Sequence, residues 1–188
     1  MPYFQNAANF LVQAIIGFAI YVVLMRFWMQ WVRADFRNQL GQFVIVLTNP
    51  VVIPLRKILP SIKTIDTATI VLALLVSFIK VFAYFALSNF GTPSPLTYLL
   101  MSIGVLFKYS IYLFLAAIFI QIIASWVNPN SYHPIIMIAR SVSEPLLAPA
   151  RRIIPPIGGL DLSPMIIILF LQFSLLSIVA PLTAGHSL

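Results

Sequence analysis

The segment Asn49–Pro60 occurs twice in this chain, and the repeat constrains which architectures the sequence can form. Its sequence NPVVIPLRKILP returns as EPLLAPARRIIP over Glu144–Pro155, with the prolines, the basic pair and the following isoleucine at the same spacing. Each residue lies 95 positions from its counterpart, and this offset holds without a gap from Trp31 to Asp66. We therefore predict a tandem repeat of one structural unit, with this motif at the centre of each copy.

The composition indicates that the repeat lies in a membrane. Of the 188 residues, 61% are hydrophobic and only 8% are charged, whereas a soluble domain is about half apolar and about a quarter charged. The net charge of +7 predicts a basic face toward anionic lipid headgroups or an acidic partner, and not a nucleic-acid groove. The chain has no cysteine, which excludes disulfides, thiolate metal sites and thiol catalysis.

Long apolar runs predict an all-α membrane protein with four transmembrane helices. A helix rises ~1.5 Å per residue, so about 20 residues cross a ~30 Å hydrocarbon core. The first repeat is predicted over 1–92 and the second over 93–188. The predicted spans are about 8–32 and 67–87 in the first repeat, and about 106–127 and 165–184 in the second.

The third apolar run, Leu96 to Val127, is too long for one perpendicular crossing. Either this helix is tilted, or residues 96–106 lie along the membrane surface and Gly104 marks a bend. We favour the bend, which would place Lys108 near an interface.

Between the spans of each copy, the pattern predicts a pair of short amphipathic helices, over about 38–60 and about 134–155. Leu40, Phe43, Val44 and Leu47 follow helical spacing, and the pattern breaks at Asn49–Pro50 before it resumes. The apolar run is only 13 residues long and contains prolines, so it is too short to span. These proline-kinked helices are therefore interfacial or re-entrant.

The distribution of basic residues predicts the topology. The termini and the segment 88–97 carry no lysine or arginine, and the basic residues of the two loops are Arg33, Arg37, Arg56, Lys57 and Lys63, then Arg140, Arg151 and Arg152. Both basic loops fall on one side of four spans, which the positive-inside rule makes cytoplasmic. The repeat is then parallel, with both termini on the outer side of the membrane.

The doubled pattern Trp-Val … Pro-x-x-x-Pro-x-(Arg/Lys)-(Arg/Lys)-Ile-x-Pro … (Ile/Leu)-Asp resembles the YggT family of bacterial and plastid membrane proteins. The segments Arg26–Val32, Ser77–Lys80 and Gly158–Pro164 are similar to its proteobacterial two-copy branch. The resemblance covers essentially the whole chain and implies an inner-membrane protein without established enzymatic activity. It also implies an association with osmotic-stress response, with cell division or nucleoid distribution, or in plastids with cytochrome b maturation.

The residues that could carry enzyme chemistry are few and poorly placed. The histidines and acids of the chain are His133, His186, Asp35, Asp66, Glu144 and Asp161. No two of them have metal-ligand spacing, no nucleophile–base set is visible, and neither histidine is on a predicted span where it could bind haem. The sequence therefore predicts no catalytic residue, no metal site and no cofactor.

Five charged residues lie in or beside the predicted spans. Asp66 and Asp161 are predicted as helix caps, or as ion-pair partners of the basic dipeptides Arg56-Lys57 and Arg151-Arg152. Arg26 is predicted to extend its side chain outward to the interface. Lys80 and Lys108 are the other intramembrane charges, and Lys80 either extends outward or has a functional role.

The residues predicted to form a lipid or partner interface are Pro50, Pro54, Arg56, Lys57 and Pro60, with Pro145, Pro149, Arg151, Arg152 and Pro155. The basic dipeptides are explained equally well by anionic-lipid binding and by topology alone, and a protein-docking surface is a third explanation. We predict a non-enzymatic scaffold or assembly factor that engages anionic lipid and an unidentified membrane or cytoplasmic protein, and that can form a homo-oligomer. The alternative is a component or modulator of potassium homeostasis, acting as an oligomer or beside a channel.

Overall fold

The structure, a computed structural model, describes residues 2–62, 65–87, 91–128, 132–154 and 161–183. Its helices are α1 (Pro2–Trp31), α2 (Gln39–Ile58), α3 (Thr67–Leu87), α4 (Pro95–Val127), α5 (Pro134–Ile153), α6 (Ser163–Ser174), the π-helical turn η1 (Leu175–Val179) and α7 (Ala180–Leu182). The described part of the chain contains no β-strand, only an isolated bridge between Ile62 and Ile65. The predicted all-α class is confirmed.

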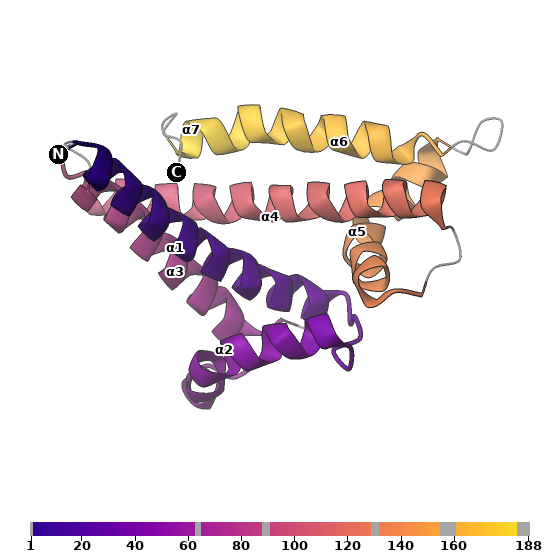
Figure 1. Cartoon of the computed structure of the whole chain (residues 1–188), viewed down its shortest axis with the longest axis horizontal. Coiled ribbons are helices and arrows are strands. Elements are labelled where there is room, and N and C mark those ends of the chain that lie inside the picture. The colour runs from indigo at the N-terminus through magenta and orange to yellow at the C-terminus, as the bar shows by residue number, and fades with distance from the viewer. Residues whose placement is uncertain (1, 63–64, 88–90, 129–131, 155–160, 184–188) are drawn as a thin grey trace.

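Four helical segments are long and apolar enough to cross a membrane, as the sequence predicts. They are Ala7–Trp31, Thr67–Leu87, Pro95–Val127 and the composite helix Ser163–Leu182. In Figure 1, α1 and α3 form one arm of a V, and α4 and α6 form the other. The start of α1 and the short helix α7 lie near the closed end of the V, while α2 and α5 lie toward its open end. The two copies therefore run in the same direction, as a parallel repeat.

The loop helices α2 and α5 are built alike. Their ends differ by the repeat offset, because Gln39 corresponds to Pro134 and Ile58 to Ile153. Both helices end on an extended residue whose N–H returns to a carbonyl four residues earlier, at 2.8 Å in α2 and 2.9 Å in α5. The repeat thus extends from the sequence to the helix boundaries.

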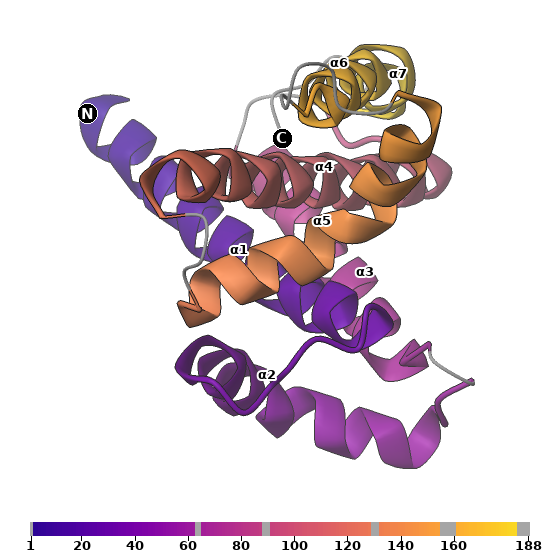
Figure 2. The same ribbon diagram turned by 90° about the vertical axis from the view of Figure 1, so that its right-hand side faces the viewer.

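Each loop holds one helix where the sequence predicts a pair. Pro50 and Pro54 lie inside α2, and Pro145 and Pro149 lie inside α5. Figures 1 and 2 show that both helices change direction along their length. An interior proline removes one helical hydrogen bond, which bends a helix without ending it when neighbouring groups satisfy the freed carbonyl.

Asn49 and Ser143 lie inside these continuous helices, each shortly before the first proline of its motif, and neither caps a helix. The N-cap of α2 is Asn38, whose side chain accepts a hydrogen bond from the N–H of Gly41 at 2.8 Å. The N-cap of α5 is His133, whose Nδ1 accepts from the N–H of Ile135 at 3.4 Å. Asn49 and Ser143 are thereby available to bond with the spans.

The predicted surface segment over 96–106 is wrong, because α4 is one unbroken helix from Pro95. Gly104 is buried and does not mark a bend. A Cβ atom at Gly104 would lie 2.9 Å from Cβ of Leu182 and 3.0 Å from Cγ2 of Thr183. Gly104 therefore allows the last span to approach α4 closely, in the way that small residues do between membrane helices.

This packing predicts that Gly104→Leu destabilises the protein. A leucine here must displace the C-terminal end of the last span, and overpacking of this kind costs about 1–3 kcal/mol. Thermal unfolding of the purified protein in detergent measures the effect. The matched control is Gly91→Ala, where an added Cβ meets nothing within 4 Å. Equal melting temperatures for the two variants would show that the α4–α7 contact does not depend on Gly104.

Candidate functional site

An ion pair joins α2 to the start of α3 in the first repeat. Nη2 of Arg56 lies 2.5 Å from Oδ2 of Asp66, and Nε of Arg56 donates to both carboxylate oxygens at 3.3 and 3.2 Å. The Thr69 hydroxyl donates to the same carboxylate at 2.5 Å. The side chain of Asp66 has 0% exposure, whereas that of Arg56 is 37% exposed. Asp66 is thus a buried acid held by one basic residue and one hydroxyl.

The second repeat contains the equivalent pair, 95 residues later. Nε of Arg151 donates to Oδ2 of Asp161 at 2.9 Å, and Oδ1 of Asp161 accepts from the backbone N–H of Ser163 at 2.9 Å. Nη1 of Arg151 also donates to both carboxylate oxygens of Glu144, at 3.1 Å each. Both aspartates therefore form an ion pair with the first basic residue of their dipeptide, and Asp161 additionally accepts a hydrogen bond from the first residue of α6.

Arg26 forms a second link between a span and α2. Its Nη1 donates to Oγ1 of Thr48 at 2.5 Å and to Oδ1 of Asn49 at 2.8 Å. Arg26 is only 5% exposed, so the predicted outward extension of this side chain is wrong. The guanidinium turns inward because two polar side chains of α2 supply acceptors beside it, which are better partners than hydrocarbon.

Gln121 occupies the position equivalent to Arg26 and makes the equivalent link. Its Nε2 donates to the Ser143 hydroxyl and, at 3.3 Å, to the carbonyl of Ala139. Ser143 corresponds to Thr48, and both residues are fully or almost fully buried. Each loop helix is thus attached to the bundle twice, once by the first span of its repeat and once by the start of the second.

We call these two clusters the first and second junctions. The first junction comprises Arg26, Asn49, Arg56, Lys57 and Asp66, and the second comprises the repeat-equivalent residues Gln121, Glu144, Arg151, Arg152 and Asp161. The predicted site list missed Asn49, Gln121 and Glu144. Two features of the sequence could have identified them. Arg26 and Gln121, like Asn49 and Glu144, are separated by the repeat offset, and all four are polar residues beside or within apolar segments.

The second basic residue of each dipeptide lies at the surface. Lys57 and Arg152 are both exposed, and each is followed by an isoleucine that is itself exposed, Ile58 at 77% and Ile153 at 79%. The predicted interface prolines Pro50, Pro54, Pro60, Pro145 and Pro149 are exposed as well. Pro155 lies outside the described residues. Each loop helix therefore presents a cation beside apolar side chains on its outer surface.

Lys80 is buried between three helices, so its outward extension is also excluded. Its Nζ donates to Oε1 of Gln13 at 2.7 Å and to the Gln13 carbonyl at 3.3 Å. It also lies 5.7 Å from the ring centroid of Tyr109, and the residue is 3% exposed. Nε2 of Gln13 is buried without a hydrogen-bond partner among the described residues. Lys108 lies within the continuous α4, 6.0 Å from the Tyr112 ring centroid.

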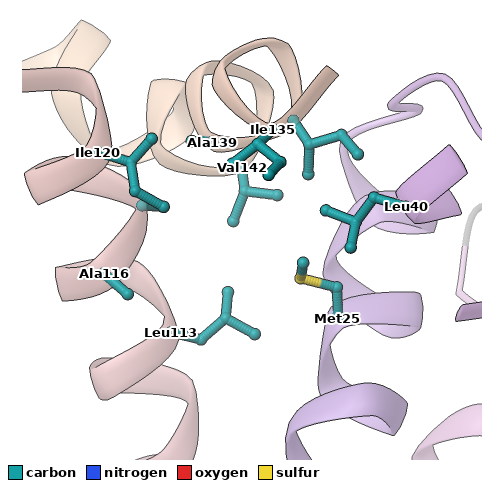
Figure 3. A pocket seen from close by; sticks show the side chains of 10 residues that line it. Met25, Leu40, Leu113, Ala116, Ile120, Ile135, Ala139 and Val142 are labelled. Atoms are coloured by element: carbon teal, nitrogen blue, oxygen red, sulfur yellow. The ribbon is translucent and has the colours of Figure 1, made fainter. Parts of the chain in front are cut away.

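A small apolar cavity lies between the two repeats, next to α2 and α5. Figure 3 shows it between α4 on one side, α5 above and Met25 with Leu40 on the other side. Its volume is about 100 Å³, and its lining consists of aliphatic side chains and methionine. Water gains no hydrogen bonds in such a space, so the cavity suits only apolar groups.

Both junction aspartates have pKa values below their ordinary value of 3.8. Burial alone raises the pKa of Asp66, but the hydrogen bonds from Arg56 and Thr69 and the nearby positive charges outweigh burial. At Asp161, burial is likewise outweighed by the bonds from Arg151 and Ser163. Both carboxylates are therefore ionised near neutral pH.

These shifts predict that the protein loses stability in acid. An acid with a lowered folded-state pKa stabilises the fold above its unfolded-state pKa, and this contribution disappears as the pH falls through the folded-state pKa. We expect the melting temperature to fall progressively below about pH 4. The control is Arg56→Gln/Asp66→Asn, which lacks the buried acid and is expected to show a shallower pH dependence. An identical slope in both proteins would contradict a role for Asp66.

Among the described residues, no group of three or more histidine, cysteine, aspartate or glutamate side chains is placed to hold a metal ion. The polar chemistry present consists of ion pairs and hydrogen bonds between helices. It fixes helices relative to one another and presents cations at a surface.

Comparison with known proteins places the chain in a family. A family model described as CCB3/YggT matches residues 5–87 and again residues 100–182, so the two matches share the offset of the repeat. An uncharacterized protein of Vibrio alginolyticus, encoded in the proC 3' region, is 37% identical over 90% of this chain and 92% of its own length. The uncharacterized protein YggT of Escherichia coli K12 is 36% identical over 89% of this chain and 86% of its own length.

A further relative, an uncharacterized protein of Pseudomonas aeruginosa, is 37% identical over 89% of this chain and 86% of its own length. No solved structure matches the chain. The family match covers both repeats and includes both junctions, which confirms the resemblance drawn from the doubled proline–basic motif. The chain belongs to the CCB3/YggT family of membrane proteins.

Proposed function

We propose that the protein is a non-enzymatic scaffold or assembly factor of the bacterial inner membrane. In this proposal α2 and α5 lie at the cytoplasmic face, engage anionic lipid headgroups and present a surface to a partner complex. The termini and the connection between α3 and α4 are then periplasmic. The charge distribution and the placement of both loop helices toward the open end of the V support this orientation.

The observation that carries the proposal is that the two basic residues of each dipeptide have different surroundings. Arg56 and Arg151 bind the junction aspartates, so they attach the loop helices to the spans. Lys57 and Arg152 are exposed and adjoin exposed isoleucines. A cation beside apolar side chains on a helix matches the boundary between headgroups and acyl chains, and each such cation adds about 1 kcal/mol of attraction to an anionic surface.

The proposal predicts that Lys57→Gln/Arg152→Gln weakens binding of anionic lipid without unfolding the protein. Two lost cations correspond to about a tenfold or greater loss of apparent affinity for phosphatidylglycerol. Native mass spectrometry of the purified protein, titrated with phosphatidylglycerol and separately with phosphatidylcholine, measures this loss. The matched control is Arg140→Gln, which removes an exposed cation of α5 outside the junctions.

Two results would overturn the scaffold proposal. One is unchanged phosphatidylglycerol binding by the double variant, which would leave membrane topology as the sole role of these cations. The other is potassium or rubidium flux through liposomes that contain the purified protein, if that flux depends on Lys80. Flux of this kind would establish the potassium-homeostasis alternative in place of a scaffold.

A further inference from the structure

The two junctions have the same framework but different charge. The first junction has three cations, Arg26, Arg56 and Lys57, against the single acid Asp66, which gives a net charge of +2. The second junction has two cations against the acids Glu144 and Asp161, which gives a net charge of zero. The difference comes from two equivalent positions, where Arg26 and Asn49 are replaced by Gln121 and Glu144.

The contacts show that this difference is not cancelled within the first junction. The hydrogen bonds of Arg26 go to Thr48 and Asn49, which are both neutral, so they satisfy the guanidinium without neutralising it. Arg56 directs Nε and Nη2 to Asp66, and Nη2 also lies 3.4 Å from Oε1 of Gln30. One acid therefore compensates one of three cations.

In the second junction, the arginine equivalent to Arg56 is shared between two acids. Glu144 stands where Asn49 stands in the first junction, and both of its oxygens accept from Nη1 of Arg151. Asp161 accepts from Nε of the same guanidinium. Because Glu144 is 46% exposed, it also places a negative charge at the surface where an anionic headgroup would approach.

We infer that the first junction is the anion site of this protein, that it takes the phosphodiester headgroup of an anionic phospholipid, and that the second junction does not. The inference rests on the proposed function and specifies which repeat binds the lipid. Exposed Lys57 and the partly exposed Arg56 supply donors to the phosphate. Arg26 is buried against α2 and does not contact the headgroup itself. Its charge keeps the first junction positive, and this charge attracts the anionic headgroup more strongly across a medium of low dielectric constant than across water.

Exchanging the two differing residues between the repeats tests this inference. Arg26→Gln/Asn49→Glu gives the first junction the charges of the second, and Gln121→Arg/Glu144→Asn does the reverse. The probes are phosphatidylglycerol and phosphatidylcholine, titrated into the purified protein and followed by native mass spectrometry. The first exchange is expected to reduce phosphatidylglycerol affinity about tenfold, because two charge units are lost, and to leave phosphatidylcholine binding unchanged.

The reverse exchange keeps the inference testable if the first variant unfolds, because it is expected to add a phosphatidylglycerol site to an intact first junction. Glycerol phosphate at millimolar concentration serves as the headgroup without acyl chains, and it is expected not to displace the lipid. Displacement would overturn the assignment to a lipid in favour of a free phosphate compound.

The outcome also separates this inference from the proposed function. If neither exchange alters phosphatidylglycerol affinity, the inference is overturned. If Lys57→Gln and Arg152→Gln then lower the affinity equally, the proposed function stands, with both junctions acting alike. If the first exchange does lower the affinity, the inference also requires that Lys57→Gln lowers it and Arg152→Gln does not.

Discussion

Arg56→Gln is expected to destabilise the protein by about 3 kcal/mol or more, whereas Arg151→Gln is expected to cost about 1 kcal/mol. The two arginines are equivalent in the repeat, but their aspartates are not equally buried. The Asp66 side chain has 0% exposure, and that of Asp161 is 33% exposed. Loss of Arg56 leaves a carboxylate without an ionic partner away from water, and Thr69 is then the one side chain among the described residues that still donates to it.

The second repeat tolerates the same change because water can replace the lost partner. Asp161 keeps its hydrogen bond from the Ser163 N–H and gains hydration on its exposed side. Reversible unfolding in detergent, followed by the melting temperature and by titration with sodium dodecyl sulfate, measures both variants. The double variant Arg56→Gln/Asp66→Asn is expected to recover most of the stability, since no unpaired charge remains buried. Equal losses for Arg56→Gln and Arg151→Gln would contradict the difference in burial.

The second large effect is expected in the opposite direction, at Lys80. Replacing Lys80 by methionine together with Gln13 by leucine is expected to stabilise the protein by about 1–4 kcal/mol, the range seen when buried charged groups give way to apolar ones. Among the described residues, the ammonium lies between helices beside an amide oxygen, a backbone carbonyl and an aromatic ring. The equivalent position of the second repeat is Leu175, so the repeat does not require a charge there.

The two single variants distinguish the contribution of Lys80 to stability from that of Gln13. Lys80→Met alone leaves the Gln13 amide buried without a partner and is expected to give a smaller gain than the double variant. Gln13→Leu alone removes the acceptor and is expected to destabilise. If the double variant melts at a lower temperature than the natural protein, Lys80 is a structural link between α1 and α3. A gain in stability would show that the charge is retained at a cost to the fold.

The architecture was predictable because it depends on periodicity and length. The repeat offset, the four spans and the position of the loop helices follow from patterns that each segment carries by itself. The bounds of α2 and α5 agree with the predicted loop helices to within about two residues. The inferred pair of helices differs from the single bent helix because proline is a weaker stop signal where neighbouring side chains satisfy the backbone.

The site was less predictable because it depends on which side chains meet across helices. The sequence alone allows the Arg26 side chain to extend outward to the interface or inward between the helices. The inward orientation depends on the acceptors that Thr48 and Asn49 of α2 supply, and these meet Arg26 only in the folded protein. The sequence does not decide between a capping role for Asp66 and its pairing with Arg56, because capping is local whereas the pairing depends on how α2 packs against the start of α3. The close approach of Leu182 to Gly104 of α4 is a contact between distant parts of the chain, which no local pattern contains.

The central claim is that the repeat places both loop helices, with their exposed cations, on the cytoplasmic face of the membrane. Because the chain has no cysteine, single variants report on one position each. Lys57→Cys, Arg152→Cys and Gly91→Cys can be treated with a membrane-impermeant maleimide in intact spheroplasts and in inverted vesicles. We predict that Lys57→Cys and Arg152→Cys are labelled only in inverted vesicles, and Gly91→Cys only in spheroplasts. Labelling of Lys57→Cys and Arg152→Cys from opposite sides would contradict the parallel repeat, and labelling of both in spheroplasts would contradict the cytoplasmic placement.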